Sequence, residues 1–230
     1  MSSLDTIATG ASFRICGMSS STSPDIDRYF EALDHTGFGG EIRRDLATRI
    51  VHATDNSIYQ FLPAAVVHVR WAEDVARMLR LGTEDRFRAL SFSARGGGTG
   101  TNAQSLTTGI VVDCSKYLNR IHEINPEEGW VEVEPGVILD RLNGVLKPHG
   151  LFFAPNVSTS SRATIGGMIS TDACGQGSRQ NSSTATRSLR SMSRAGMPSA
   201  NVASAKCVTV TSGQCSSTRD HHAAVSSSLK

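Results

Sequence analysis

Long apolar runs are absent from this sequence. No stretch reaches the roughly 18 to 20 apolar residues that a transmembrane helix needs. The first residues, up to Pro24, are rich in serine and lack the apolar segment of a secretory signal peptide. The sequence therefore predicts no transmembrane segment, and we expect a cytoplasmic protein.

Cysteine pairs at metal-binding spacing are also absent. The cysteines are an odd number, and no two of them form a C-x-x-C pair; they are Cys16, Cys114, Cys174, Cys207 and Cys215. This pattern indicates neither a disulfide framework nor a zinc or iron–sulfur ligand set. We therefore predict no metal site in this chain.

The last quarter of the chain lacks aromatic residues. Residues 178–230 contain no Phe, Tyr or Trp, only Asp220 as an acidic residue, and 19 Ser or Thr among 53 positions. Such a composition does not supply a packed core. The segment also holds seven of the 23 Lys and Arg residues, so the overall charge of +2 does not indicate a nucleic-acid-binding fold. We expect a disordered N-terminus (1–24), one folded domain (25–177) and a low-complexity, disordered tail (178–230).

Glycine, in contrast, is concentrated in one short stretch. Residues 94–102 read Ala-Arg-Gly-Gly-Gly-Thr-Gly-Thr-Asn and follow the strand-like run 90–93. Because glycine loses more conformational freedom on folding than any other residue, such a cluster needs a compensating reason. Close approach of backbone N–H groups to an anion is one such reason, and Arg95, Thr99 and Thr101 add further donors. The stretch predicts a diphosphate-binding loop, and a flexible glycine turn is the alternative.

Two common phosphate-binding motifs do not fit this loop. The dinucleotide motif G-x-G-x-x-G would need glycine at position 101, where the chain has Thr101. The Walker motif needs lysine after its last glycine, and the residue after Gly100 is again Thr101. The loop thus indicates neither a Rossmann nor a Walker site.

Periodicity around the loop predicts alternating strands and helices. Three helices are expected: from Pro24, with Ile26, Tyr29, Phe30 and Leu33 inward; from Glu73, with Val75, Met78, Leu79 and Leu81; and over 137–146, with Ile138, Leu142 and Val145. Strands are expected over 64–69, 87–93, 109–113 and 130–134, with a weaker one at 121–124. The order strand, helix, strand, loop is that of a βαβ unit, in which ligands bind beyond the carboxyl ends of the strands.

Some polar residues in these strands have both a structural and a chemical interpretation. His68 lies in the apolar run 64–69, where a packed core histidine is favoured over a ligand. Glu132 and Glu134 share the outward face of strand 130–134. Solvated strand charges are favoured over a catalytic carboxylate pair. No catalytic residue is predicted.

A second segment combines hydroxyl side chains with glycine. Residues 158–160 are Ser-Thr-Ser, and Thr164 precedes Ile-Gly-Gly-Met (165–168) as a candidate helix cap. Glycines that open a short helix let its N-terminal N–H groups approach an anion. This segment predicts a second contact with the ligand of the glycine loop.

Together the two segments resemble a flavoprotein family, that of vanillyl-alcohol oxidase and p-cresol methylhydroxylase. The similarity lies in the loop 94–102, Phe-Phe-Ala-Pro at 152–155, and residues 158–160, 162–169 and 171–178. Within the family the sequence is most similar to FAD-linked D-2-hydroxyacid dehydrogenases, acting on D-lactate or D-2-hydroxyglutarate, with a C-terminal iron–sulfur domain. Residues 53–60 and 109–113 match as well, so the resemblance runs from about Phe30 to Ser178.

The resemblance implies an α/β fold and FAD as the cofactor. The fold is the FAD-binding domain of the p-cresol methylhydroxylase type, with two α/β subdomains of which the second is incomplete. The residues implied at the FAD diphosphate are Arg95, Gly96, Gly97, Gly98, Thr99, Gly100, Thr101 and Asn102. Those implied along the flavin are Pro155, Ser158, Thr159, Thr164, Gly166, Gly167, Thr171, Asp172 and Gly175. The sequence departs from the family pattern at Ala94, where proline is usual, and at Cys174. We interpret Cys174 as a small buried residue rather than a redox thiol.

The resemblance ends at Ser178. Relatives continue into more of the flavin domain, a substrate domain and iron–sulfur cysteines, and a reading-frame shift or a natural linker would each explain the change here. The implied function is the N-terminal, FAD-binding portion of an oxidoreductase that transfers hydride from a small D-2-hydroxyacid to flavin. The electron acceptor is left open. The alternative is a truncated, catalytically inert nucleotide-binding fragment.

Overall fold

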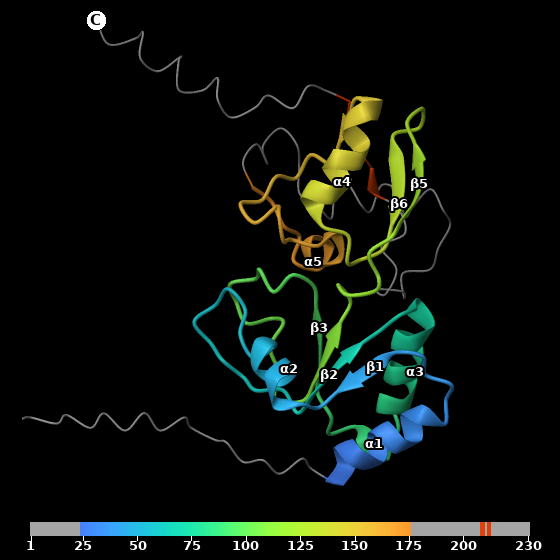
Figure 1. Ribbon diagram of the computed structural model, residues 1–230, viewed down its shortest axis with the longest axis vertical. Helices are drawn as coiled ribbons and strands as arrows, with labels where there is room; N and C mark the ends of the chain where they lie inside the picture. The colour runs from blue at the N-terminus through green and yellow to red at the C-terminus, as the bar shows by residue number, and fades with distance from the viewer. Residues whose placement is uncertain (1–23, 176–207, 210, 213–230) are drawn as a thin grey trace, which may run out of the picture.

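The computed structural model describes residues 24–175, 208–209 and 211–212, which form two α/β lobes (Figure 1). The first lobe contains α1 to α3 and β1 to β4, and the second contains β5 to β7, α4 and α5. In Figure 1, α5 lies where the two lobes meet. The predicted disordered N-terminus and most of the predicted tail lie outside the described residues.

A four-stranded sheet forms the centre of the first lobe. Its strands are β1 (Glu41–Arg43), β2 (Ala65–His68), β3 (Phe92–Arg95) and β4 (Ile110–Asp113). The spatial order is β1-β2-β4-β3, with β1 antiparallel to β2 and the other three strands parallel. Every residue of β2 and β4 is buried, as expected of valine-rich strands in a parallel sheet. The predicted βαβ unit is present, but β4 separates its two strands.

Helices cover the sheet of the first lobe and fill its core. These are α1 (Pro24–Asp34), α2 (Leu46–Val51), α3 (Ala72–Gly82) and the 3-10 helix η1 (Asp85–Phe87). The fully buried Tyr29 of α1 packs edge-on against Phe87 and donates a 2.8 Å hydrogen bond from its hydroxyl to the Met78 carbonyl of α3. The predicted inward faces of α1 and α3 are confirmed at these positions. Leu79 is the exception, because it is half exposed.

The second lobe pairs a β-hairpin with two helices. Strand β5 (Ile121–Asn125) is antiparallel to β6 (Trp130–Val133), and α4 (Leu139–Leu146), the 3-10 helix η2 (Lys147–His149), β7 (Leu151–Phe152) and α5 (Ile165–Ser170) follow. Leu139, Leu142 and Leu146 point inward from α4, whereas Val145 is 40% exposed. The predicted inward position of Val145 is therefore wrong, because Leu139, Leu142 and Leu146 form the buried face of this helix.

Two short strands from the predicted tail also pair with the second lobe. Val208–Thr209 (β8) is antiparallel to β6, and Thr211–Ser212 (β9) is antiparallel to β7. The other residues of the predicted tail (178–230) lie outside the described part of the chain, so the disorder expected of this tail stays a prediction.

Candidate functional site

The glycine loop begins where β3 ends, at the carboxyl edge of the parallel sheet. Within the described residues, none of the backbone N–H groups from Gly96 to Thr101 donates a hydrogen bond to the protein. The hydroxyls of Thr99 and Thr101 make none either in this part of the chain. Gly98 has φ +63°, in the left-handed region that glycine adopts without strain. The loop therefore presents a run of free donors suited to an anion.

The second predicted segment lies directly against this loop. A Cβ atom added at Gly96 would overlap the Thr164 side chain, and one added at Gly97 would overlap the backbone carbonyl of Arg162. Gly96 and Gly97 are thus required for close approach of the two segments. The structure brings together the two stretches that the sequence singled out separately.

The N-terminus of α5 is held by protein rather than left open. The Ile165 N–H donates to Val137, the Gly166 N–H donates to the Pro135 carbonyl at 2.8 Å, and the Gly167 N–H faces the Thr164 hydroxyl at 3.4 Å. The expectation that free N–H groups of this helix approach an anion is therefore wrong.

Several glycines of the second segment also serve packing. Gly166 is required for close approach to Pro135, since an added Cβ would lie 2.9 Å from its carbonyl oxygen. Gly175 packs in the same way against the Asn156 carbonyl. A contact of either glycine with flavin stays a prediction.

The remaining predicted residues lie around this junction. Pro155 is buried and Ser158 is exposed, while the Thr159 carbonyl accepts hydrogen bonds from the N–H groups of residues 162 and 163. Asn102 donates its N–H to the Gln104 side chain. Asp172 has φ +46°, and the Thr171 hydroxyl donates to the Gly167 carbonyl. Cys174 is exposed, so its interpretation as a small buried residue is wrong.

Arg95 is partly buried beneath the loop. Its Nη2 donates a 2.8 Å hydrogen bond to the Thr54 carbonyl, and its Nη1 lies 3.5 Å from the Ser105 hydroxyl. Burial lowers the pKa of Arg95, and the charges of Asp113 and Asp55 oppose that shift. The guanidinium remains a cation within a few ångströms of the loop backbone.

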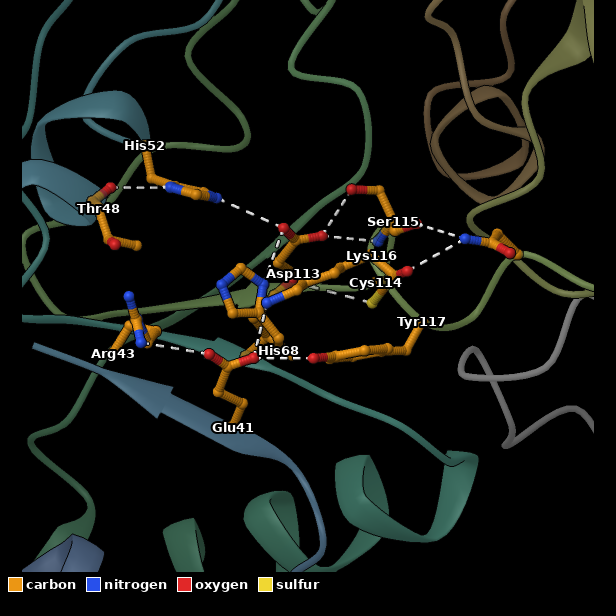
Figure 2. A network of polar contacts seen from close by, with 12 residues as sticks. Glu41, Arg43, Thr48, His52, His68, Asp113, Cys114, Ser115, Lys116 and Tyr117 are labelled. Atoms are coloured by element: carbon orange, nitrogen blue, oxygen red, sulfur yellow. Dashed lines mark hydrogen bonds and ion pairs between the residues drawn. The ribbon is translucent and has the colours of Figure 1, made fainter.

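A buried carboxylate lies at the end of β4, level with Arg95 across the strand pair. Asp113 accepts hydrogen bonds from His68 at 3.1 Å, His52 at 3.4 Å and the Ser115 N–H at 2.6 Å (Figure 2). Burial alone would raise the pKa of Asp113, but these hydrogen bonds outweigh it and hold the pKa well below its usual range. His68 is 6% exposed, which confirms the interpretation as a core histidine.

Charged residues near β1 and β6 form ion pairs. Glu41 accepts from Lys116 and from the Tyr117 hydroxyl (Figure 2), and the hydrogen bond from Lys116 is the main reason that its pKa falls to about 2. Glu134 accepts from Arg120 at 2.9 Å. Glu134 is therefore a paired charge rather than a freely solvated one.

Comparison with known proteins identifies the family of this arrangement. A family model described as an FAD binding domain matches residues 63–197, which include both the glycine loop and the segment packed on it. The chain belongs to this FAD-binding domain family. FAD is its cofactor, and the resemblance inferred from the two segments is confirmed.

Two curated relatives of this FAD-binding chain are named as dehydrogenases. It is 60% identical over 156 residues to D-2-hydroxyglutarate dehydrogenase of Pseudomonas putida, an alignment that covers 68% of this chain and 16% of the relative. It is 58% identical over 150 residues to the protein of the same name from Escherichia coli, covering 65% of this chain and 15% of the relative. The chain thus spans about one sixth of the length of these relatives.

A solved structure confirms the fold of this FAD-binding chain. The structure of alkyldihydroxyacetonephosphate synthase superposes with a TM-score of 0.59 at 16% sequence identity, covering 73% of this chain and 35% of that one. The predicted α/β class is therefore confirmed. Within the described residues, no helix is long and apolar enough to cross a membrane.

The described residues fit the diphosphate of FAD. Gly96 and Gly97 let the loop pack closely against Thr164 and Arg162, and the N–H groups from Gly96 to Thr101 lack acceptors in the described chain. One residue that the sequence reasoning did not select is Arg162, which is exposed next to Gly97. Arg162 could have been selected from the sequence because it lies in segment 162–169, which resembles the flavoprotein family.

Proposed function

We propose that this chain is the FAD-binding portion of a dehydrogenase that oxidises a small D-2-hydroxyacid, with D-2-hydroxyglutarate as the favoured substrate. The observation that carries the proposal is the row of N–H groups from Gly96 to Thr101 that have no acceptor within the described residues and lie against the segment at Arg162. The names of the relatives at 60% and 58% identity support the substrate. The electron acceptor is not part of the proposal.

The chain's own residues bind and orient the cofactor. The loop N–H groups donate to the diphosphate, Thr99 and Thr101 add hydroxyl donors, and Arg162 adds positive charge at the open side of the loop. Bound FAD supplies the hydride acceptor, while the protein supplies position and electrostatics. The predicted residues from Pro155 to Gly175 are proposed to lie along the flavin.

Taken alone, the 230-residue chain is proposed to bind FAD without turnover. The chain spans about one sixth of the length of its relatives, and the sequence predicts no catalytic residue in it. Orientation of substrate and acceptor accounts for several kcal/mol of a typical barrier, roughly 7 to 11 in the best cases. A cytoplasmic location belongs to the same proposal and is tested by cell fractionation.

The test separates cofactor binding from catalysis. The purified chain is mixed with FAD and desalted, and its visible spectrum is recorded; retained flavin absorbance is expected. D-2-hydroxyglutarate and an artificial electron acceptor are then added to this chain and, in parallel, to a fusion of residues 1–178 with the remaining domains of the Pseudomonas putida relative. Only the fusion is expected to reduce the acceptor. Loss of all flavin on desalting, or turnover by the unfused chain, would contradict the proposal.

A further inference from the structure

We propose that Arg95 is a positioning residue that holds the glycine loop in its ligand-binding conformation and does not itself contact the diphosphate. This inference rests on the proposal that the loop binds the diphosphate of FAD. It departs from the role that the family resemblance implies for Arg95.

The guanidinium joins the loop to two other segments. Nη2 donates to the Thr54 carbonyl at 2.8 Å, and Nη1 lies 3.5 Å from the Ser105 hydroxyl. Ser105 is 7% exposed and donates in turn to the Asp55 carboxylate at 3.2 Å. The start of the loop is thereby tied to residues 54–55 and to the chain that leaves the loop at 105. Two of the five N–H donors of the Arg95 guanidinium are therefore directed at the protein.

The turn at Gly98 lies directly on the same guanidinium. A Cβ atom added at Gly98 would lie 2.5 Å from Nη2 and 2.8 Å from Cζ of Arg95. Gly98 also has φ +63°, so the chain reverses over the planar group without room for a side chain. Arg95 therefore supports the turn that aims the loop N–H groups. Preorganised donors bind more tightly because less ordering is needed on binding.

Arg162 provides the contrast. It is exposed, its backbone touches Gly97, and within residues 24–175 its side chain makes no ion pair or hydrogen bond. Its charge is therefore available to a ligand, whereas that of Arg95 is partly buried near Asp55 and Asp113. The two arginines at the loop have separate tasks: Arg95 shapes the loop, and Arg162 meets the anion.

The experiment compares the loop before and after FAD is added. Backbone order parameters of residues 96–102 are measured by ¹⁵N relaxation in the ligand-free 230-residue chain, and FAD dissociation constants are measured by flavin fluorescence at two salt concentrations. The variants are Arg95→Gln, Ser105→Ala and Arg162→Gln. Arg77→Gln is the control, because Arg77 also donates to a distant backbone carbonyl, that of Gly37, but on α3.

A positioning role predicts a distinct pattern. In Arg95→Gln the loop order parameters fall from about 0.85 to below roughly 0.6 without ligand. The FAD dissociation constant rises roughly tenfold or more, as expected for loss of a charged hydrogen bond. Ser105→Ala changes the order parameters and the dissociation constant in the same direction but by less. In a double variant that carries both Arg95→Gln and Ser105→Ala, the combined effect is smaller than the sum of the two single effects. Arg162→Gln raises the dissociation constant and weakens its salt dependence while the free loop stays ordered, and Arg77→Gln changes neither.

One result would overturn the inference. If Arg95→Gln leaves the ligand-free loop ordered but weakens FAD binding and its salt dependence, Arg95 is a direct ligand. If Arg95→Gln fails to fold, Ser105→Ala still tests the inference. Unchanged order parameters of the loop in Ser105→Ala count against a role for the contact between Arg95 and Ser105. If even the wild-type chain fails to bind FAD, the proposed function fails, while the order parameters still decide the role of Arg95.

Discussion

Replacing Gly97 with alanine adds one methyl group where the loop meets the second lobe. The new Cβ would overlap the Arg162 carbonyl oxygen and lie 2.9 Å from its carbonyl carbon. Both are backbone atoms, so they cannot rotate away as a flexible side chain would. Gly97 does not have a positive φ, so the expected damage comes from this contact and not from backbone strain. The loop must move away from residues 162–164.

The size of the effect follows from the cost of overpacking. Adding a methyl group to a closely packed site costs about 1–3 kcal/mol. If that cost appears as displacement of the loop from its binding position, the FAD dissociation constant rises by about 5- to 150-fold. Gly97→Val, with a larger side chain, is expected to exceed this range.

Flavin fluorescence titration measures this change, with Gly144→Ala as the matched control. An added Cβ at Gly144 meets nothing within 4 Å, and the residue lies inside α4. The control is expected to keep its FAD affinity and to gain about 0.5–1 kcal/mol of stability, because alanine is the better helix former. Wild-type affinity and melting temperature in Gly97→Ala would refute the contact between Gly97 and Arg162.

Two further predictions concern stability. Glu41→Gln removes a carboxylate whose pKa is lowered from 4.5 to about 2. The wild type is therefore expected to have the higher unfolding free energy, with the full difference above pH 4.5 and a shrinking difference as the pH falls toward 2. Urea unfolding from pH 7 to 2.5 measures this difference, and a difference that does not change with pH contradicts the ion pair with Lys116. Leu142→Ala lowers the unfolding free energy by about 2–5 kcal/mol, whereas Val145→Ala changes it by less than about 1 kcal/mol. Equal losses in urea unfolding would show that the buried face of α4 is assigned wrongly.

Local pattern predicted most of the elements but not their order in space. Ile26, Tyr29 and Leu33 recur at helical spacing, and α1 follows from them. Helix α2 was not predicted, because it has no buried residue to set a period. Its only local signal is Asp45, whose side chain caps the helix by accepting from the Thr48 N–H. The position of β4 between β2 and β3 depends on pairing across the sheet, which no local spacing encodes.

The glycine residues of the site could be predicted from the sequence, but the hydrogen-bond partners that lie far away along the chain could not. Gly96 and Gly97 stand out in the sequence because a cluster of glycines is costly without a reason. The partners of Arg95, at Thr54 and Ser105, lie 41 and 10 residues away along the chain. The bond between His68 and Asp113 spans 45 residues. Such pairings follow from strand order, so they became visible only with the fold.

The placement of β4 also affects how the protein folds and how it tolerates change. The chain leaves β3 at Arg95 and returns to begin β4 at Ile110, and these two strands are parallel neighbours. Parallel neighbours need a crossover connection, usually a helix, and here residues 96–109, which begin with the glycine loop, make that connection without a helix. Pairing of β3 with β4 brings the two ends of this connection together, so the loop closes as part of folding. Insertions here should therefore impair folding, unlike those in most surface loops.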